Sequence, residues 1–349
     1  MRTSYSEQDV TMLLKDITGM VEPLDNAERE RRIQSGVHYS EMLPKESLPS
    51  EVYKRTFLTA LERYAAPTAK AAECIAERIL AEKGRDVVLV SLARAGTPIG
   101  ILLRRYLKQF HGIDAPHYTI SIIRGRGIDK NAMRYLLDRY EPKQIQFIDG
   151  WTGKGAIRNQ LREAMQDFPG VDDRVAVLSD PAGVTPLCGT HEDFLIPSSC
   201  LNSTVSGLIS RTFCRSDIIG EDDFHGAMYY EAYESADMSN LFLDTVQAQF
   251  GCDYIFPEEA VSDRSPIAEV EEIARHFGIA DINFVKPGIG ETTRVLLRRI
   301  PWKILVHSLD DTAFLGHIYQ LAEEKQIELE VYPFRHYRAC GLIKNLADT

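Results

Sequence analysis

A glycine-rich loop within residues 146–157, QFIDGWTGKGAI, contains the residue types that bind phosphate groups. An apolar run ends at Asp149, and glycines then lead into a segment with helical character. Backbone N–H groups and the dipole at a helix start attract a phosphate monoester, and glycine lets the backbone approach it. The spacing fits neither the P-loop nor the dinucleotide fingerprint. The predicted phosphate ligands of this loop are Gly150, Thr152, Gly153, Lys154 and Gly155.

Two other loops place cations after apolar runs. The first loop, SLARAGTP at 91–98, contains Arg94. The second loop, IIRGRGIDK at 122–130, contains Arg124, Arg126 and Lys130. Such cations stabilise a leaving group on which negative charge accumulates. An alternative is that the arginines of the second loop are only solvated surface charge. The predicted cationic clamp comprises Arg94, Arg124, Arg126 and Lys130.

These loops lie at the ends of alternating elements. A strand is typically a short β-branched run, and a helix shows apolar residues at a period of 3.6. The alternation predicts an α/β fold with a doubly wound parallel sheet, in which ligands bind at the carboxyl ends of the strands. The predicted strands span 86–93, 117–123, 144–149 and 174–179, with helices at 98–110 and 156–165.

The loop after Asp149 resembles that of the type I phosphoribosyltransferases, in which a strand, an acid and a Thr-Gly loop hold the 5-phosphate of phosphoribosyl pyrophosphate. The resemblance implies Mg²⁺ bound through the diphosphate, with Asp149 binding ribose hydroxyls or the water ligands of the magnesium, and transfer of phosphoribose to a base-like acceptor. Gly150 stands where the family often has a second acid. The resemblance implies a pyrophosphate loop of Ala95, Gly96 and Thr97, and acceptor contacts from Asp180, Asn202, His225 and Tyr229.

Composition limits the other possibilities. The formal net charge is −11, which argues against a whole-chain polycation for nucleic acid or membranes. No apolar run approaches the roughly 20 residues that span a bilayer, and no export signal is evident, so a cytoplasmic protein is expected. The six cysteines show no C-x-x-C, and neither a disulfide framework nor a structural metal site is indicated.

A rival function rests on Cys200 and His225, which lie in the irregular region 180–256. A thiolate–imidazolium pair is the machinery of a cysteine hydrolase. The segments HYSEMLP, IDGWTGKG, SSCLNSTVSGL and DFHGAMYY are similar to a bacterial family of tellurite-resistance stress operons, some members of which are labelled StiP-type cysteine proteases. A third possibility is a catalytically silent phosphoribosyl pyrophosphate sensor that binds RNA.

The C-terminal region resembles the Pelota-type RNA-binding domain through VKPGIGE and a late Arg-Ala-Cys-Gly. The implied domains are an N-terminal helix and irregular arm at 1–66, a transferase-like domain with a cap at 67–256, and the RNA-binding-like domain at 263–349. The predicted function of the whole chain is that of a phosphoribosyltransferase linked to RNA binding and a stress response. The predicted RNA contacts are Lys286, Gly288, Glu291, Arg294, Arg298 and Arg338.

Overall fold

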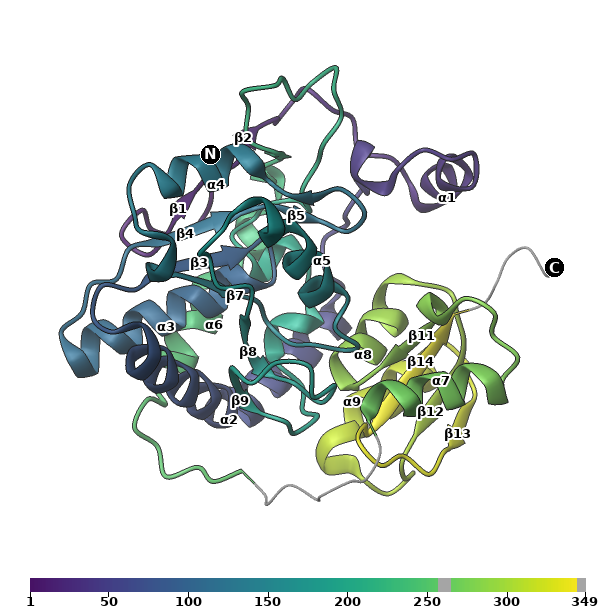
Figure 1. Cartoon of the computed structure of the whole chain (residues 1–349). Helices are drawn as coiled ribbons and strands as arrows, with labels where there is room; N and C mark the ends of the chain where they lie inside the picture. The colour runs from purple at the N-terminus through teal and green to yellow at the C-terminus, as the bar shows by residue number, and fades with distance from the viewer. Residues whose placement is uncertain (257–264, 344–349) are drawn as a thin grey trace.

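The computed structural model describes residues 1–256 and 265–343, apart from the side chains of residues 26, 30 and 298. Two α/β units pack against each other (Figure 1). The larger contains a six-stranded sheet, and the smaller, near the C-terminus, contains its own four-stranded sheet. The predicted fold class, a doubly wound parallel sheet followed by a smaller α/β domain, is confirmed.

The large sheet is parallel throughout, in the order β1-β4-β3-β7-β8-β9. Chain order reverses between β3 and β7, so the loops that follow these two strands meet at the switch point of the sheet. The strands are β1 (Thr11–Met12), β3 (Val88–Leu92), β4 (His117–Ile120), β7 (Ile145–Ile148), β8 (Val175–Ser179) and β9 (Cys188–Thr190).

Helices cover both faces of this sheet, which is why its central strands are continuous apolar runs. One face packs against α2 (Glu51–Lys83), α3 (Gly96–His111) and α6 (Ser239–Gln247). The other packs against α4 (Lys130–Leu137) and α5 (Ala156–Ala164). The loops at the strand ends are therefore held by two separate hydrophobic layers.

The N-terminal region differs from its prediction as a helix and an irregular arm. In place of the expected N-terminal helix the chain forms β1, which pairs with β4, and β2 (Lys15–Asp16). These residues pair as strands because their apolar side chains are buried in separate clusters rather than along one helix face. The following segment forms α1 (Asn26–Gln34) and η1 (Tyr39–Glu41), and α2 begins sixteen residues before Pro67.

The segment between β9 and α6 consists of short elements. One of them, β10 (Gly226–Ala227), forms a two-stranded parallel ribbon with β2. Elsewhere, after β4, a hairpin joins β5 (Ile122–Ile123) to β6 (Gly127–Ile128). The 3₁₀ turns of this domain are η2 (Pro142–Gln144), η3 (Met165–Asp167), η4 (Pro197–Cys200), η5 (Ser203–Val205) and η6 (Glu231–Ala236).

The C-terminal domain has the strand order β11-β14-β12-β13, with β14 antiparallel to both of its neighbours. Its apolar residues partly join the core of the large domain, because α8 and α9 contribute to the same buried cluster as α2. The elements are α7 (Pro266–His276), η7 (Ile282–Phe284), β11 (Val285–Pro287), α8 (Ile289–Arg298), β12 (Pro301–Val306), α9 (Thr312–Glu324), β13 (Leu329–Val331) and β14 (Ala339–Ile343).

Among the helices of the described ranges, none combines the length and the apolar character needed to cross a bilayer.

Candidate functional site

Asp149 follows β7 at the switch point, as the sequence predicts. Its carboxylate accepts a hydrogen bond from the N–H of Gly150 at 2.8 Å. Burial raises the pKa of Asp149 to about 6, and the neighbouring Arg294 counteracts only part of this effect. A carboxyl group in this setting loses its charge more readily than an exposed one.

This pKa shift leads to a prediction for stability. Because the pKa of Asp149 is raised in the folded state, the folded state binds this proton more tightly than the unfolded chain does. The stabilisation that the bound proton provides is therefore lost as pH rises from about 4 to about 6. We expect Asp149→Asn to raise the free energy of unfolding by about 2–3 kcal/mol at pH 8 and to change it little at pH 4. Chemical denaturation at both pH values measures this difference, with Asp222→Asn on the exposed surface as the control. Equal effects at both pH values would contradict it.

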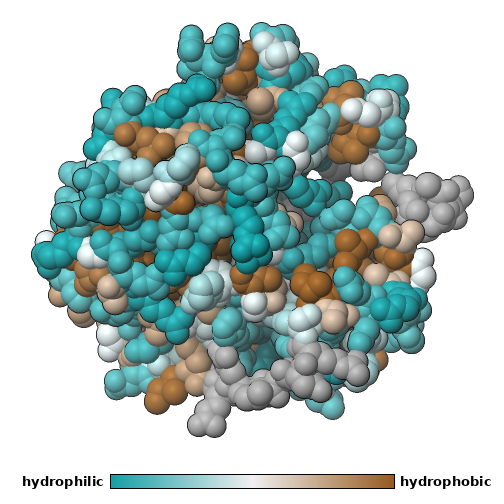
Figure 2. Space-filling model, viewed as in Figure 1, coloured by the Kyte–Doolittle hydropathy of each residue, from teal (hydrophilic) through white to brown (hydrophobic). Residues whose placement is uncertain are grey.

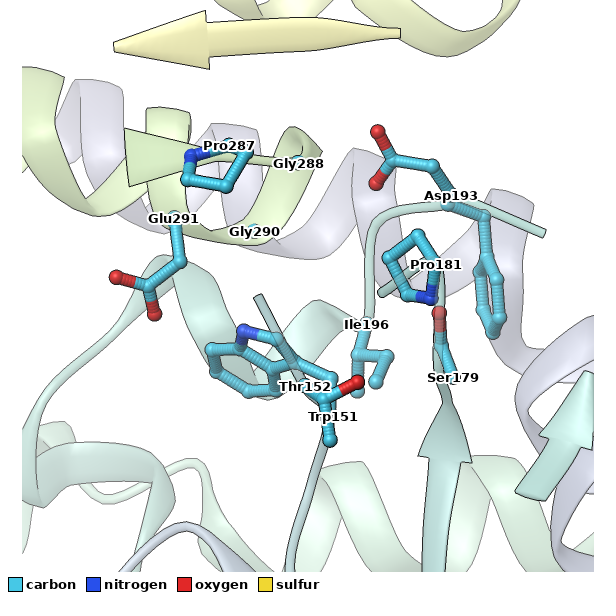
Figure 3. A pocket seen from close by; sticks show the side chains of 11 residues that line it. Trp151, Thr152, Ser179, Pro181, Asp193, Ile196, Pro287, Gly288, Gly290 and Glu291 are labelled. Atoms are coloured by element: carbon cyan, nitrogen blue, oxygen red, sulfur yellow. The ribbon is translucent and has the colours of Figure 1, made fainter. Parts of the chain in front are cut away.

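The C-terminal domain covers the loop that the sequence assigns to phosphate (Figure 3). A Cβ atom on Gly153 would lie 3.3 Å from the side chain of Glu291 and 3.5 Å from the carbonyl of Pro287. The hydroxyl of Tyr337 donates to the carbonyl of Gly153 at 2.9 Å. The glycine therefore permits close contact between two domains, with a carboxylate lying where a phosphate was expected.

Lys154 is also used in this contact. Its ammonium group donates to the carbonyls of Ile282 and Val285. Burial, together with repulsion from the nearby Lys286, lowers the pKa of Lys154 to about 8. The cation at the centre of the glycine loop thus binds backbone oxygens of the C-terminal domain.

A small cavity remains at this interface, between Trp151, Thr152, Asp193, Pro287 and Glu291 (Figure 3). Its volume of about 10 Å³ is close to the minimum for one water molecule. A sugar phosphate has no space there in this arrangement of the domains.

The predicted cationic clamp does not converge on one point. Arg94 pairs with Glu46 and also donates to Asn202, which was an expected acceptor contact. The remaining three cations have separate partners elsewhere on the surface. Arg124 donates to Asn283, Arg126 to Glu41 and the carbonyl of Cys214, and Lys130 to Asp167.

The residues expected to hold the pyrophosphate serve packing. A Cβ atom on Gly96 would lie 2.3 Å from the carbonyl of Ile148, so Gly96, next to Ala95, allows α3 to approach β7. Thr97 is buried and accepts from the hydroxyl of Thr119 at 3.1 Å.

The structure places Cys200 and His225 in different surroundings. Cys200 ends η4, in the core between α2 and α8. His225 lies beside β10. Its ring Nδ1 is 2.8 Å from Ser121 Oγ, and its backbone N–H donates to the carboxylate of Asp129. Tyr229, another predicted acceptor contact, donates to Glu234.

A different cysteine contacts a histidine. Cys188 begins β9, and His191 follows the end of that strand. The thiol Sγ of Cys188 is 3.5 Å from Nε2 and 3.8 Å from Nδ1 of His191. Both ring nitrogens therefore lie within contact distance of the sulfur, and Nε2 is the nearer of the two. The thiol is buried, whereas the imidazole side chain is 40% exposed.

Asp180 orients this pair. His191 Nδ1 lies 2.8 Å from the carbonyl oxygen of Asp180, which favours the tautomer with the proton on Nδ1 and the lone pair on Nε2. The Asp180 side chain accepts from Thr152 and from the N–H groups of Val184 and Thr185, and one carboxylate oxygen is 3.9 Å from His191 Nδ1. Burial raises the pKa of Asp180. The three residues form a Cys–His–Asp arrangement, in which Asp180 and His191 follow the ends of β8 and β9 and Cys188 lies at the start of β9.

Among the residues that the structure describes, the same three side chains have the spacing of a metal site. Their donor atoms lie within 4.8 Å of one another, and Cys, His and Asp all bind Zn²⁺. The hydrogen bonds that Asp180 accepts from Thr152, Val184 and Thr185 already fix its carboxylate, and they favour a positioning role for it.

The predicted RNA contacts lie largely against the large domain. Gly288 has φ near +91°, and a Cβ atom on it would lie 3.3 Å from a carboxylate oxygen of Asp193. Lys286 is partly buried, and burial lowers its pKa. The remaining three have partners: Arg294 pairs with Glu291 and lies over Trp151, and Arg338 pairs with Glu192. The side chain of Arg298 lies outside the described residues.

Comparison with known proteins identifies both parts of the chain. A family model described as "Tellurite-like stress resistance cysteine protease StiP" matches residues 3–247. The chain belongs to the StiP family. A second model, the PELOTA RNA binding domain, matches residues 264–345. The chain is also 35% identical over 364 residues to "Cysteine protease StiP" of Acinetobacter baylyi (strain ATCC 33305 / BD413 / ADP1), covering 98% of this chain and 94% of that protein.

Two solved structures resemble part of this StiP-family chain. A hypoxanthine-guanine phosphoribosyltransferase from Bacillus anthracis shares 15% identity, with a TM-score of 0.25, over 39% of this chain and 73% of that one. The enzyme from Leishmania tarentolae in complex with GMP shares 19%, with a TM-score of 0.26, over 39% and 75%. Neither likeness carries an argument about function.

The predicted phosphoribosyltransferase activity is wrong. The family and the curated relative are both named for a cysteine protease, which places the chain in a family of enzymes of another type. The physical reason that the prediction failed is visible at Gly153, where the glycine loop accommodates the C-terminal domain rather than a phosphate. Magnesium was expected only through the diphosphate of that reaction and remains untested.

Sequence reasoning overlooked Cys188 and His191. The signal was present as CGTH, a cysteine and a histidine three residues apart, shortly after a predicted strand. The strand β9, which begins with Cys188 and ends just before His191, has only three residues, too few to show an alternation of apolar and polar side chains.

Proposed function

We propose that the protein is a cysteine-dependent hydrolase of peptide bonds, with Cys188 as the nucleophile and His191 as the general base. The observation that carries this proposal is the 3.5 Å contact between Cys188 Sγ and His191 Nε2. The family name supports a thiol nucleophile, and this contact selects one cysteine of the six.

The proposed chemistry follows from the geometry. His191 Nε2 removes the thiol proton, and the thiolate of Cys188 attacks the carbonyl carbon of the peptide bond. The imidazolium then returns the proton to the leaving amine as the C–N bond breaks, which gives a thioester. Water, deprotonated by the same imidazole, hydrolyses the thioester and restores the thiol. The carbonyl of Asp180 holds the imidazole through Nδ1 during both steps.

A substitution of the histidine tests the base. We expect His191→Gln to lower kcat/KM for a fluorescently labelled denatured protein substrate by about 10²–10⁴-fold, the usual contribution of a general base. His276→Gln, on the exposed end of α7, is the control and should retain wild-type activity. Wild-type protein without hydrolysis under reducing conditions would overturn the proposed function, and an active His191→Gln variant would overturn the role of the base.

We also propose that the C-terminal domain binds RNA, because the PELOTA RNA binding domain model matches nearly all of it. The predicted contacts Arg294 and Arg338 pair with Glu291 and Glu192 in the docked state, so RNA that uses them must compete with these acids. Fluorescence anisotropy with labelled RNA hairpins and single strands tests the proposal. Affinity unchanged by Arg294→Ala combined with Arg338→Ala would exclude this surface.

A further inference from the structure

Arg211 is a partly buried cation without an acidic partner. Within the ranges that the structure describes, its guanidinium makes no hydrogen bond or ion pair, and its one recorded interaction is with the ring of Tyr39, 5.3 Å from the centroid. Burial lowers the pKa of Arg211 to about 10. Other partly buried arginines of this chain are paired: Arg105 contacts Asp9 and Asp244, for example.

Three other arginines act electrostatically on this guanidinium. Repulsion from Arg29, Arg94 and Arg294 adds to burial in lowering the pKa of Arg211. A buried charge is costly unless an opposite charge compensates it, and these three charges have the same sign as Arg211. A cation–π contact with one tyrosine is weaker than an ion pair and does not replace one.

The acids in this region are engaged with other groups. Glu46 pairs with Arg94 at 2.8 Å and accepts from the N–H of Ser203 at 3.0 Å. Glu291 pairs with Arg294 at 3.0 Å. Within the part of the chain that the structure describes, neither acid compensates the charge of Arg211, and a bound anion would do so.

The cluster bridges the two domains. Arg29 lies on α1 and Arg294 on α8, while Arg94 and Arg211 belong to the strand-end loops and the segment that crosses them. The space-filling view shows the surface hollowed between the lobe around α1 and the C-terminal domain (Figure 2). The helices α1, which carries Arg29, and α8, which carries Arg294, lie on opposite sides of this hollow (Figure 1).

We propose that Arg211, with Arg29, Arg94 and Arg294, forms a binding site for a small, multiply charged oxyanion in the hollow between the domains. Guanidinium groups bind phosphate and carboxylate through paired N–H donors, and several of them favour an anion with more than one negative charge. The partial burial of Arg211 suits a small headgroup better than a polymer backbone. This site is separate from Cys188, and it does not depend on hydrolysis.

Thermal unfolding of the full chain tests the site. Dialysed wild-type protein is compared in chloride and, at equal ionic strength, in phosphate, pyrophosphate or succinate, with acetate as the monovalent control. We expect a bound dianion at saturating concentration to raise Tm by about 2–5 °C. The oxyanion that gives the largest rise in Tm, a phosphate or the dicarboxylate succinate, identifies the class of anion that the site prefers.

Variants of the central arginine make the test specific. Arg211→Met should lose the oxyanion-dependent rise in Tm and should melt no lower than wild type in chloride, because it removes an uncompensated buried charge. Arg211→Lys keeps the charge without the paired donors and should weaken binding about tenfold. Arg275→Met, an exposed cation on α7, should retain the full rise. A wild-type Tm unchanged by every oxyanion, or an equal rise in Arg211→Met, would overturn the proposal.

Discussion

Replacement of Cys188 by alanine is expected to lower kcat/KM for peptide hydrolysis by about 10⁴-fold or more, because the covalent step has no other nucleophile at this position. The small volume change at the start of β9 leaves the strand pairing of Val177 with residue 188 intact. Fold retention is checked by circular dichroism and by the Tm of the variant.

Cys200→Ala is the matched control for this loss. Cys200 is also buried, but it lies in the core between α2 and α8 rather than beside His191. We expect this variant to lose some stability, as large-to-small core substitutions do, and to retain its specific activity. An inactive Cys200→Ala variant together with an active Cys188→Ala variant would reverse the assignment.

The second large effect concerns the contact between the domains. Asp193 is buried and accepts from the N–H groups of Ile289 and Arg338, both at 2.8 Å. We expect Asp193→Ala to lower the free energy of unfolding by about 2–4 kcal/mol, since it leaves the buried N–H of Ile289 and the partly buried N–H of Arg338 without their acceptor. Denaturant unfolding measures this loss, and Asp222→Ala on the exposed surface is the control.

This interface also lies next to the proposed base. His191, Glu192 and Asp193 are consecutive, and the last two bind the C-terminal domain through Arg338. Undocking therefore changes the backbone beside the imidazole, and Asp193→Ala should reduce hydrolysis as well as stability. A variant with wild-type stability would show that Asp193 does not hold the domains together.

The sequence predicts the sheet of the large domain well because its strands are apolar runs separated by amphipathic helices. The predicted strand at 144–149 is β7, and the predicted helix at 156–165 is α5. The N-terminal region was harder to predict. The predicted boundary between the N-terminal arm and the transferase-like domain at Pro67 falls inside α2, which continues through the proline with the hydroxyl of Thr68 donating to the carbonyl of Tyr64.

The candidate site was predictable only in part. The position of Asp149 at a strand end follows from local pattern, but the partner of the adjacent glycines does not. Gly153 meets Glu291, which is 138 residues away in the chain, and no local pattern encodes such a contact. Cys188 and His191 are close in sequence, yet only the pairing of β9 with β8 places them beside Asp180.

Peptide mapping by mass spectrometry after reaction with a peptidyl chloromethyl ketone tests the central claim most directly. The native wild-type protein is treated with a limiting amount of the reagent, digested and searched for the modified thiol among its six cysteines. We expect modification of Cys188 in the wild type and its loss in His191→Gln, because the imidazole generates the reactive thiolate. Modification of Cys200 instead, or equal labelling of Cys188 with and without His191, would contradict it.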